Sequence, residues 1–434
     1  MNTKRNILAR SAVALALCVW GAGAQAQSFT DVVQSALTIY PSLISAKAKT
    51  DAARSDIERA RAAHFPQISM GLARNSYGSG KLPETSSVKS NAQTPSARLN
   101  LWSGGRIEAD ARRAEALTEG SEFQEAVTRD DVAQLAAEAY INWARGLEMA
   151  DLATKNLESH QITLNDIRKI VAVDAGRRID LEQAQVRMDN AKLIKLQRDT
   201  DLAQARQRLT RFWSDRLPIK PSGLVEAVRN GGRLYQMPSN FAELQNNLFE
   251  DLPSVAQQRA QVQAAEAAVD MAKGQYWPTV DLSVTRQPNP YNLNSRLEPQ
   301  MDTFTQVQLN MPLYNGGSVS AQIQTSVSQL QAAQFALEET RLLAREKASL
   351  AWHEWASARE RATQGAEQAR VGDKVVDGYR QQFRLARRQL LDLLNIQAEA
   401  FGYQSAATSA YYDEQIARTR LLASMGDLAR RFAP

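Results

Sequence analysis

The side chains that most often carry catalysis or bind metals are few and scattered in this sequence. Its three histidines, His64, His160 and His353, lie far apart along the chain. A zinc-binding helix that begins at His353 and Glu354 needs a second histidine four residues after the first, where the chain has Ser357. This scatter argues against a metal site and against a histidine-based catalytic relay. We therefore expect no enzymatic activity and no cofactor.

A phosphate-binding loop is also incomplete. Residues 78–81 read Gly-Ser-Gly-Lys, but the full pattern needs a glycine at position 75 and Ser or Thr at position 82, where the chain has Asn75 and Leu82. Adjacent acids such as Glu338 and Glu339 are typical of a solvated helix face. The basic residues alternate with acids along the chain, so the charge balance does not indicate a nucleic-acid partner.

The start of the chain has the pattern of a secretory signal peptide. A basic beginning is followed by an apolar run at residues 12–20 and by Ala-Gln-Ala at residues 24–26. The run is shorter than the ~20 residues that a spanning helix needs. We predict that residues 1–26 are removed. Cys18, the only cysteine, lies in this signal, so the mature chain would contain no disulfide.

The strongest pattern in the chain is an internal repeat at a constant offset of 212 residues. Five corresponding pairs show it: Pro41 with Pro253, Pro66 with Pro278, Gly104 with Gly316, Tyr140 with Trp352, and Asp180 with Asp392. Such an offset indicates a gene duplication with almost no net insertion. Each copy is expected to begin with two helices, at residues 28–40 and 41–64 in the first copy and 240–252 and 253–276 in the second. A proline then ends the helical stretch.

Alternating apolar residues after each of these prolines predict two β-hairpins, at residues 67–102 and 279–314. Long polar segments at residues 78–95 and 288–302 are expected to form their loops. The two copies align closely, except that Pro95 stands where the second copy has Val307.

A Gly-Gly pair then opens a proline-free stretch in each copy, at residues 105–171 and 317–383. At 1.5 Å per residue, about 67 helical residues would extend roughly 100 Å. Every seventh residue of the second stretch belongs to one seam: Ile323, Leu330, Leu337, Ala344, Ala351, Ala358, Gly365, Gly372 and Tyr379. This spacing predicts a coiled coil whose small residues allow close helix approach.

The remaining segments complete the predicted domain organisation. Turns are expected at residues 173–178 and 386–388, and return helices at 179–213 and 389–425. The structural repeats are expected at 27–213 and 240–425, and they contain helix hairpins at 105–213 and 317–425. An irregular junction is expected at 214–239 and a tail at 426–434. The fold class is therefore predicted to be mainly α-helical, with four β-strands in each chain.

The predicted strands are long enough to cross a bilayer when tilted, because ~9–11 residues suffice. Four strands cannot close a barrel, which needs about eight, and open strand edges are not tolerated in lipid. The barrel must then be shared between two or three chains. Its lipid-facing side chains would be Ile68, Met70, Leu72, Leu99, Leu101, Val280, Leu282, Val284, Leu309, Met311 and Leu313. Gln306, Gln308 and Asn310 would line the pore.

The whole mature chain resembles the TolC family of outer-membrane channel proteins. The resemblance rests on the duplication, on Phe65-Pro66 and Trp277-Pro278, on the Leu-(Trp/Tyr)-(Ser/Asn)-Gly-Gly segments at 101–105 and 313–317, and on Arg-Gln-Leu-Leu-Asp-Leu-Leu-Asn at 388–395. It implies a homotrimer with a twelve-stranded outer-membrane barrel and an α-helical coiled-coil tunnel in the periplasm of a Gram-negative bacterium. It also implies a periplasmic adaptor protein and an inner-membrane transporter as partners.

The resemblance assigns a periplasmic gate to the second turn. Asp392 matches a ring of carboxylates at the constriction, and Asn395 stands where a second acid is frequent. Residues three apart share a helix face, so one acidic ring instead of two predicts mild cation selectivity. Arg388 matches a position that helps to hold the closed state, and Asp180 is the counterpart of Asp392 in the first repeat. The alternative for Asp392 is an ordinary acid at a helix N-terminus.

The two turns are also the expected docking surface for the adaptor. The residues assigned to these tips are Gly176, Arg177, Arg178, Ala386 and Arg387. The alternative is a pair of solvated helix turns.

Three functions stay open. Residues 383–403 and the Tyr-Tyr-Asp at 411–413 resemble members that serve type I protein secretion with an ABC transporter, and the lack of a lipidated cysteine agrees with this. The second is multidrug efflux with a proton-driven RND-type pump. The third, of another class, is a coiled-coil envelope scaffold without a pore.

Overall fold

The computed structural model describes residues 29–76, 89–213, 250–288, 301–426 and 428–432. The predicted signal peptide, the junction at 214–239, most of the helix predicted at 240–252 and the outer parts of both predicted strand loops lie outside these residues. The chain divides into two compact units, the first made of residues 1–43, 128–248 and 345–434 and the second of residues 44–127 and 249–344.

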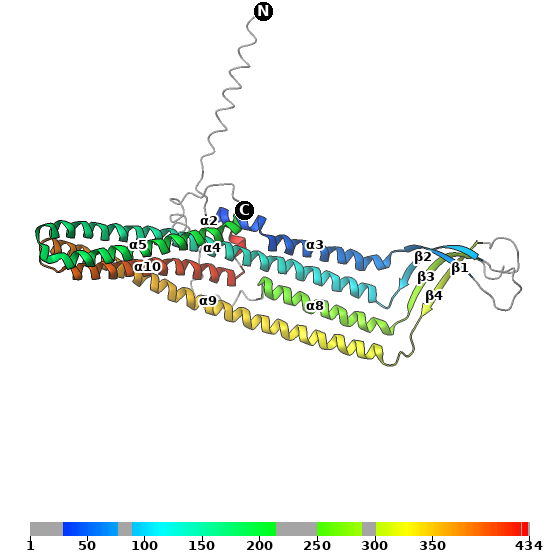
Figure 1. The fold of residues 1–434 in the computed structure, drawn as a ribbon. Helices are drawn as coiled ribbons and strands as arrows, with labels where there is room; N and C mark the ends of the chain where they lie inside the picture. The colour runs from blue at the N-terminus through cyan, green and yellow to red at the C-terminus, as the bar shows by residue number, and fades with distance from the viewer. Residues whose placement is uncertain (1–28, 77–88, 214–249, 289–300, 427, 433–434) are drawn as a thin grey trace, which may run out of the picture. The chain divides into compact units, whose positions relative to one another are not determined.

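Long helices make up most of the described chain (Figure 1). The helices are α2 (Phe29–Ile39), α3 (Pro41–Arg61), α4 (Arg106–Val173), α5 (Arg178–Leu209), α8 (Pro253–Lys273), α9 (Ser318–Arg384), α10 (Leu390–Ser424) and α11 (Leu428–Phe432). The strands are β1 (Gln67–Ser76), β2 (Lys89–Trp102), β3 (Thr279–Pro288) and β4 (Met301–Asn310). The glycine pairs before α4 and α9 have φ angles of 67° to 81°, in the left-handed region that glycine adopts without a steric penalty.

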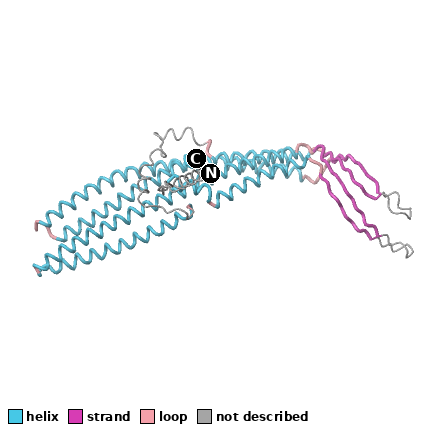
Figure 2. The backbone as a smooth tube through the Cα atoms, turned by 90° about the horizontal axis from the view of Figure 1, so that it is seen from above, coloured by secondary structure: helices cyan, strands magenta, loops and turns pink. Residues whose placement is uncertain are grey.

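In the second unit the four strands form one antiparallel sheet in the order β1-β2-β3-β4 (Figure 2). Each predicted hairpin is present, and the pairing of β2 with β3 joins the two copies of the repeat. This junction runs from Ser96 opposite Thr285 to Trp102 opposite Val280. The predicted set of four strands per chain is confirmed.

The first hairpin differs from the prediction in where its loop begins. Residues 89–95, expected in the loop, belong to β2, and Pro95 lies opposite Met70 of β1. The pairing of β2 with β3 starts only at Ser96, so beyond that residue β2 has a single neighbour. Proline has no N–H group and is tolerated where a strand lacks a second partner. The prediction placed this part of the strand in the loop because residues 78–95 are polar and rich in serine.

The second hairpin ends earlier than predicted. β4 stops at Asn310, so Met311 and Leu313 lie in the segment that follows the strand. Pro312, which cannot donate a backbone hydrogen bond, stands between them. In β2 a bulge makes Leu101 the extra residue, and Trp102 takes the place opposite Val280.

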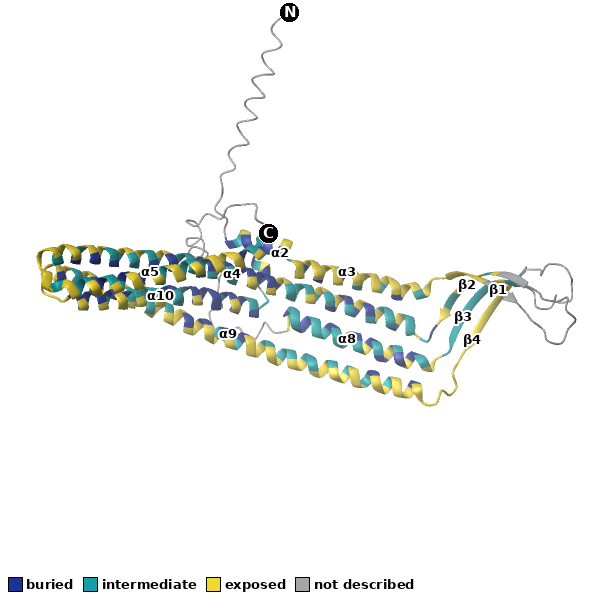
Figure 3. Cartoon of the chain, viewed as in Figure 1, coloured by how far each residue is buried: buried dark blue, intermediate teal, exposed yellow. Residues whose placement is uncertain are grey.

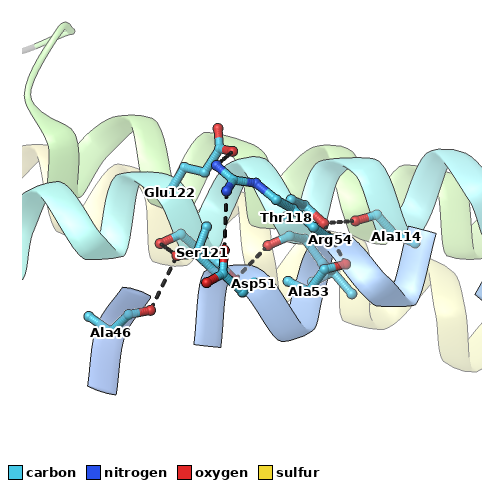
Figure 4. A network of polar contacts seen from close by, with 10 residues as sticks. Ala46, Asp51, Ala53, Arg54, Ala114, Thr118, Ser121 and Glu122 are labelled. Carbon is cyan, nitrogen blue, oxygen red and sulfur yellow. Dashed lines mark hydrogen bonds and ion pairs between the residues drawn. The ribbon is translucent and has the colours of Figure 1, made fainter. Parts of the chain in front are cut away.

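Helices α3 and α4 approach closely in the second unit because small and hydroxyl-bearing residues face each other (Figure 4). The Thr118 hydroxyl donates to the carbonyl of Ala53 at 3.0 Å, and the Thr50 hydroxyl donates to the carbonyl of Ser121 at 3.3 Å. Along α8 the buried residues are mainly alanines: Ala256, Ala260, Ala264, Ala267 and Ala272. Small side chains bury little apolar surface but allow long helices to stay in contact.

The largest apolar core of the first unit gathers aromatic rings from α2, α4, α10 and α11. The Phe29 ring lies 5.1 Å from Tyr140 and 5.4 Å from Phe432, both in edge-to-face geometry. Asp130 accepts a hydrogen bond from the backbone N–H of Ala429 at 2.8 Å and so caps α11. This core ties the last residues of the chain to its first described helix.

The predicted seam on α9 is confirmed. All nine of its positions are buried or half-buried. At Gly365 an added Cβ would lie 3.3 Å from the Cα of Ala407, and at Gly372 it would lie 3.0 Å from the ring of Tyr403. Glycine therefore sets how closely α9 approaches α10, as the small residues of the seam indicated.

Candidate functional site

The first turn joins α4 to α5 and is stabilised by contacts among its own residues. Asp174 accepts a hydrogen bond from the N–H of Gly176 at 3.0 Å, which starts a short 3₁₀ helix at Ala175–Arg177. The guanidinium of Arg177 contacts Asp180 through two nitrogens, at 2.8 and 2.7 Å. Two-nitrogen contacts of this kind fix both side chains. Asp180 also lies in the first turn of α5, where the helix dipole favours an acid.

The second turn joins α9 to α10 and has a different geometry. The N–H of Arg387 donates to the carbonyl of Gln382 and the N–H of Ala386 donates to that of Phe383, both at 2.9 Å. This is the Schellman pattern, which requires a left-handed residue after the helix. Ala386 occupies that position with φ 55°, although glycine is the usual residue there. The backbone of the second turn is therefore strained by about 1–2 kcal/mol.

Arg388 is the most connected side chain of the second turn. Its Nη1 lies 3.6 Å from Asp392, its Nε donates to the Gln382 side chain at 3.1 Å, and its guanidinium lies 4.6 Å from the centre of the Tyr379 ring. Arg388 and Asp392 are each about two-fifths exposed. The structure thus brings together the two residues that the sequence assigned to one gate, but the ion pair is looser than that of the first turn.

Asn395 has a partner that the sequence did not predict. Arg187 of α5 donates to the Asn395 side-chain oxygen at 3.1 Å and so connects α5 with α10. The repeat gave no signal for this contact, because it joins positions that do not correspond in the two copies. Asn395 accepts this hydrogen bond from the cationic side chain of Arg187. An acid in place of Asn395 would instead form an ion pair with Arg187.

A cavity of about 1040 Å³ lies between the two turns. Its lining includes four cationic side chains, Lys169, Arg177, Arg384 and Arg388, and two acids, Asp166 and Asp180. Of the residues predicted for the gate and the tips, Asp180, Arg388, Arg177 and Ala386 line it, whereas Asp392, Asn395, Gly176, Arg178 and Arg387 do not. The two turns therefore share one concavity in which basic side chains outnumber acidic ones.

A buried polar layer that the sequence analysis missed crosses the helices near these turns. The Gln397 amide donates to Ser159 and to Thr163, each at 3.2 Å, and Arg380 donates to Ser159 at 3.3 Å. His160 beside it is buried, and this burial, followed by the charge of Arg187, lowers the pKa of its imidazole. The lowered pKa favours the neutral imidazole of His160, which follows Ser159 in the chain.

The register of the sheet sorts its side chains onto two faces. One face carries Leu99, Leu282 and Val307 in one row and Trp102, Val280 and Leu309 in the next. Ile68 is 83% exposed and Leu309 is 65% exposed, and β4 is largely exposed along its length (Figure 3). Within the part of the chain that the structure describes, this apolar face is left open.

The opposite face of the sheet is polar. Arg98 donates to Asp281 at 2.9 Å, Asn100 donates to the same carboxylate at 3.0 Å, and Gln308 lies opposite Asp281 on the neighbouring strand. This confirms that polar and apolar residues alternate across the pleat.

Among the described helices, none combines the length and the apolar composition of a membrane span. The described residues contain no cluster of three or more His, Cys, Asp or Glu side chains that could hold a metal ion.

Known proteins agree with this architecture. The sequence model of the family described as outer membrane efflux protein matches residues 32–214 and 244–427. BepC, an outer membrane efflux protein of Brucella suis, is 23% identical over 94% of this chain and 87% of BepC. PrtF, a proteases secretion protein of Dickeya chrysanthemi, is 23% identical over 74% of this chain and 71% of PrtF. The outer membrane channel MtrE of Neisseria gonorrhoeae, in its open state, has a TM-score of 0.76 at 17% identity over 92% of this chain and 89% of MtrE.

These likenesses confirm the predicted fold class and the predicted location. The matched residues fall on both copies of the repeat, and the fold is that of solved outer-membrane channels. Family and fold are those of channel proteins rather than enzymes. The chain belongs to the outer membrane efflux protein family and is a channel component of the outer membrane.

Proposed function

We propose that three copies of this chain form a passive conduit through the outer membrane, with the four strands of each copy in one twelve-stranded barrel. The observation that supports this proposal most directly is the sheet of the second unit. It has an exposed apolar face, a polar face, and outer strands β1 and β4 that each have one neighbour. Strand edges are not stable in lipid, and pairing β4 of one copy with β1 of the next removes them.

The membrane-facing assignment has a direct test. Leu282 lies in the middle of the apolar face, between Leu99 and Val307. An arginine near the bilayer midplane costs ~2–4 kcal/mol on the lipid side of a barrel strand, so Leu282→Arg should abolish heat-resistant oligomers in membrane fractions. Ser283→Arg, on the polar face of the same strand, is the matched control and should assemble. Normal assembly of Leu282→Arg would show that this face does not contact lipid.

The gate proposed for the periplasmic end consists of Asp392, Asn395, Arg388 and Asp180. Three copies of Asp392 near the axis would repel one another and attract cations. Arg388 holds Asp392 at 3.6 Å and is itself held by Gln382 and Tyr379, which supports a role in closing the second turn. Planar-bilayer recording tests conduction and separates a channel from the alternative of an envelope scaffold without a pore.

The proposed docking surface for a periplasmic adaptor protein is the basic concavity between the turns together with the tips around it, Gly176, Arg177, Arg178, Ala386 and Arg387. Its size and open position between two helix hairpins suit the end of another hairpin. Charge reversal at Arg178, which has no carboxylate within 4 Å among the described residues, should weaken co-purification of an adaptor without changing the fold. Unchanged co-purification would place the docking surface elsewhere.

For the cargo we propose unfolded protein exported by an ABC transporter. The likeness to PrtF, a proteases secretion protein, supports this assignment beside the segments at 383–403 and 411–413. The likeness to BepC, an outer membrane efflux protein, supports the alternative of drug efflux with an RND-type pump. A deletion strain distinguishes them: loss of a secreted protein with unchanged drug sensitivity supports the first, and increased drug sensitivity with an intact secreted set supports the second.

A further inference from the structure

The boundary between the two copies of the repeat is present once inside each chain. There β2 of the first copy pairs with β3 of the second, whereas the outer strands β4 and β1 each have one neighbour among the described residues. At the offset of 212 residues β4 corresponds to β2, and β3 corresponds to β1. The internal pairing therefore shows, residue by residue, how β4 of one molecule can meet β1 of another.

The two hairpins have the same register, which justifies this transfer. Gln67 lies opposite Arg98 in the first hairpin, and their counterparts Thr279 and Asn310 lie opposite each other in the second. Every pair of one hairpin corresponds in this way to a pair of the other. A contact of the internal pairing is thus transferred by adding 212 to the residue number on β2 and subtracting 212 from the number on β3.

The lengths of β2 and β4 differ because only β2 has a neighbour on both sides. Beyond Arg98 β2 pairs with β3 alone and continues to Trp102. β4 stops at Asn310, the counterpart of Arg98. The apolar residues that follow are exposed, Met311 to 48% and Leu313 to 90%. Because strand residues need a partner for their backbone N–H and C=O groups, we expect a neighbour to extend β4 over this segment.

The glycine corners before α4 and α9 have the same backbone and different surroundings. Gly104 and Gly316 have φ angles of 68° and 67°. An added Cβ at Gly104 would lie 2.5 Å from the Cβ of Trp277. An added Cβ at Gly316 would lie in open space, with no contact within 4 Å among the described residues. The place that Trp277 takes beside the first corner is therefore empty beside the second, and the counterpart of Trp277 is Phe65.

The helices next to the sheet show the same difference, with α8 mostly buried or half-buried and α3 mostly exposed (Figure 3). Ala260 of α8 is 2% exposed, and an added Cβ at Gly120 of α4 would lie 3.5 Å from its Cβ. Their counterparts, Ala48 of α3 and Ala332 of α9, are both exposed. Further residues of α8 and α4 are buried where their counterparts in α3 and α9 are exposed: Ala256 against Ile44, Ala264 against Ala52, Ala109 against Ala321, and Ala116 against Ser328. The open faces of α3 and α9 thus carry the counterparts of a helix contact that α8 and α4 already make.

We infer that a second molecule of this chain docks on β4, on the corner at Gly316 and on the open face of α9, in the register of the internal pairing. The inference rests on the proposed function, to which it adds the residues that meet between neighbouring molecules. Phe65 of the neighbouring molecule lies against Gly316. Its Ala48 lies against Ala332. The opposed strand residues, named from β4 to β1 of the neighbour, are Leu309 with Leu72, Met311 with Met70, and, beyond a bulge at Leu313, Tyr314 with Ile68. Pro312 lies beside this bulge, a position at which a strand tolerates proline.

Paired cysteines test this register directly. The mature chain has no cysteine once the signal is removed, so Leu309→Cys and Leu72→Cys together provide one disulfide site between neighbours. Opposed residues of antiparallel strands have Cα atoms ~4.5–5.5 Å apart, within the range that a disulfide spans. We expect oxidation of the full mature protein in membrane fractions to link most of it into a covalent trimer on a non-reducing denaturing gel. In the matched control, Leu309→Cys with Ile68→Cys, the two positions are ~13 Å apart along the strand and should not link.

Each outcome decides a different statement. Preferred linkage of Leu309→Cys with Ile68→Cys would show another register and overturn the inference, while the proposed barrel stands. Heat-resistant oligomers that neither cysteine pair links would also overturn it, because β4 would then not meet β1 of a neighbour in this way. Failure of the parent chain to form heat-resistant oligomers would contradict the proposed barrel itself. Linkage confined to Leu309→Cys with Leu72→Cys supports both.

The contact at the glycine corner has a separate test. Gly316→Ala places a methyl group where Phe65 of the neighbour lies. Gly317→Ala is the matched control, because an added Cβ at its counterpart Gly105 has no contact within 4 Å among the described residues. Both substitutions strain a left-handed backbone, with φ of 67° and 81°, so the difference between them isolates the contact between molecules.

Gly316→Ala should leave about tenfold less heat-resistant oligomer than Gly317→Ala, as expected of an overpacked contact. Equal amounts of oligomer in the two variants would contradict the contact at this corner. A loss confined to Gly316→Ala supports it.

Discussion

The two turns of this duplicated chain occupy equivalent positions and are held in different ways. At the first turn Arg177 contacts Asp180 through two nitrogens, at 2.8 and 2.7 Å, and none of the turn's residues has a positive φ. At the second turn Arg388 lies 3.6 Å from Asp392, and Ala386 is in a left-handed conformation with φ 55°. We propose from this difference that the first turn is the fixed support and that the strained, loosely paired second turn is the part that moves.

The largest effect should follow from removing Arg388. An exposed ion pair contributes ~0.2–1 kcal/mol and an exposed cation–π contact ~0.5–1 kcal/mol. Losing both in Arg388→Ala should raise the open-to-closed ratio about tenfold in single-channel recordings. Arg177→Ala at the first turn is the matched control, and we expect a change below about threefold because Asp180 keeps its place at the helix N-terminus. Equal effects would remove the distinction between a fixed and a moving turn.

A smaller effect is expected from the backbone of the second turn. Ala386→Gly relieves the left-handed strain of an L-residue and should stabilise the closed state by about 1 kcal/mol. The melting temperature should rise and spontaneous openings should become rarer. Ala175→Gly in the first turn, where no such strain exists, should not stabilise the protein. A fall in melting temperature for Ala386→Gly would mean that the Schellman geometry is not kept in solution.

Replacing Asn395 with an acid should change the ion selectivity less than the added negative charge alone suggests. In Asn395→Asp the new carboxylate would face Arg187, whose nitrogen is 3.1 Å from the present side-chain oxygen. The cation preference, measured from reversal potentials, should therefore rise only slightly. It should rise further when Arg187→Gln is added. A full rise in the single variant would show that Arg187 does not offset the charge.

The smallest effect should come from a change of pH. It should arise from the first helix hairpin and not from the second. His160 belongs to the first hairpin, and its counterpart in the second is Gly372. Its pKa is lowered by burial and by Arg187, so the folded state favours the neutral imidazole and its stability is fully present above about pH 6.5. Stability should decrease as the pH falls from 7 toward 5, seen as a lower melting midpoint.

The exposed His353 provides the control for this pH effect. His160→Gln should flatten the dependence of the melting midpoint on pH, and His353→Gln should not. If both variants retain the slope of the parent chain, the acid sensitivity arises from other groups.

Much of the fold follows from local patterns in the sequence. The seven-residue seam from Ile323 to Tyr379, the alternation around Leu282, and the glycine pairs at the corners each depend on residues close in the chain. Their positions agree with the structure because helix and strand periods act over short distances. The end of β4 at Asn310 was missed, because alternation continues past Pro312 while strand pairing does not.

The candidate site was predictable only in part. Asp392 and Arg388 are four residues apart, but Arg388 lies in the turn before α10 and only Asp392 lies on the helix, so their short separation in the chain, and not helix geometry, brings them close. The contact between Arg187 and Asn395 joins two helices with no shared pattern, and only tertiary packing reveals it. The same holds for the layer around Gln397, where the NH2 group of a buried amide donates to hydroxyls of another helix. Strain at Ala386 likewise depends on a backbone angle that its residue type would not suggest.

The pairing of β2 with β3 has a consequence for the ancestry of the chain. This contact joins the second strand of the first copy to the first strand of the second copy within a single sheet. A protein of half the length would have made the same contact between separate molecules, six of which would complete the proposed ring. Fusion of two such genes would convert one of these intermolecular contacts into a contact within one chain, and each turn could then change without the other.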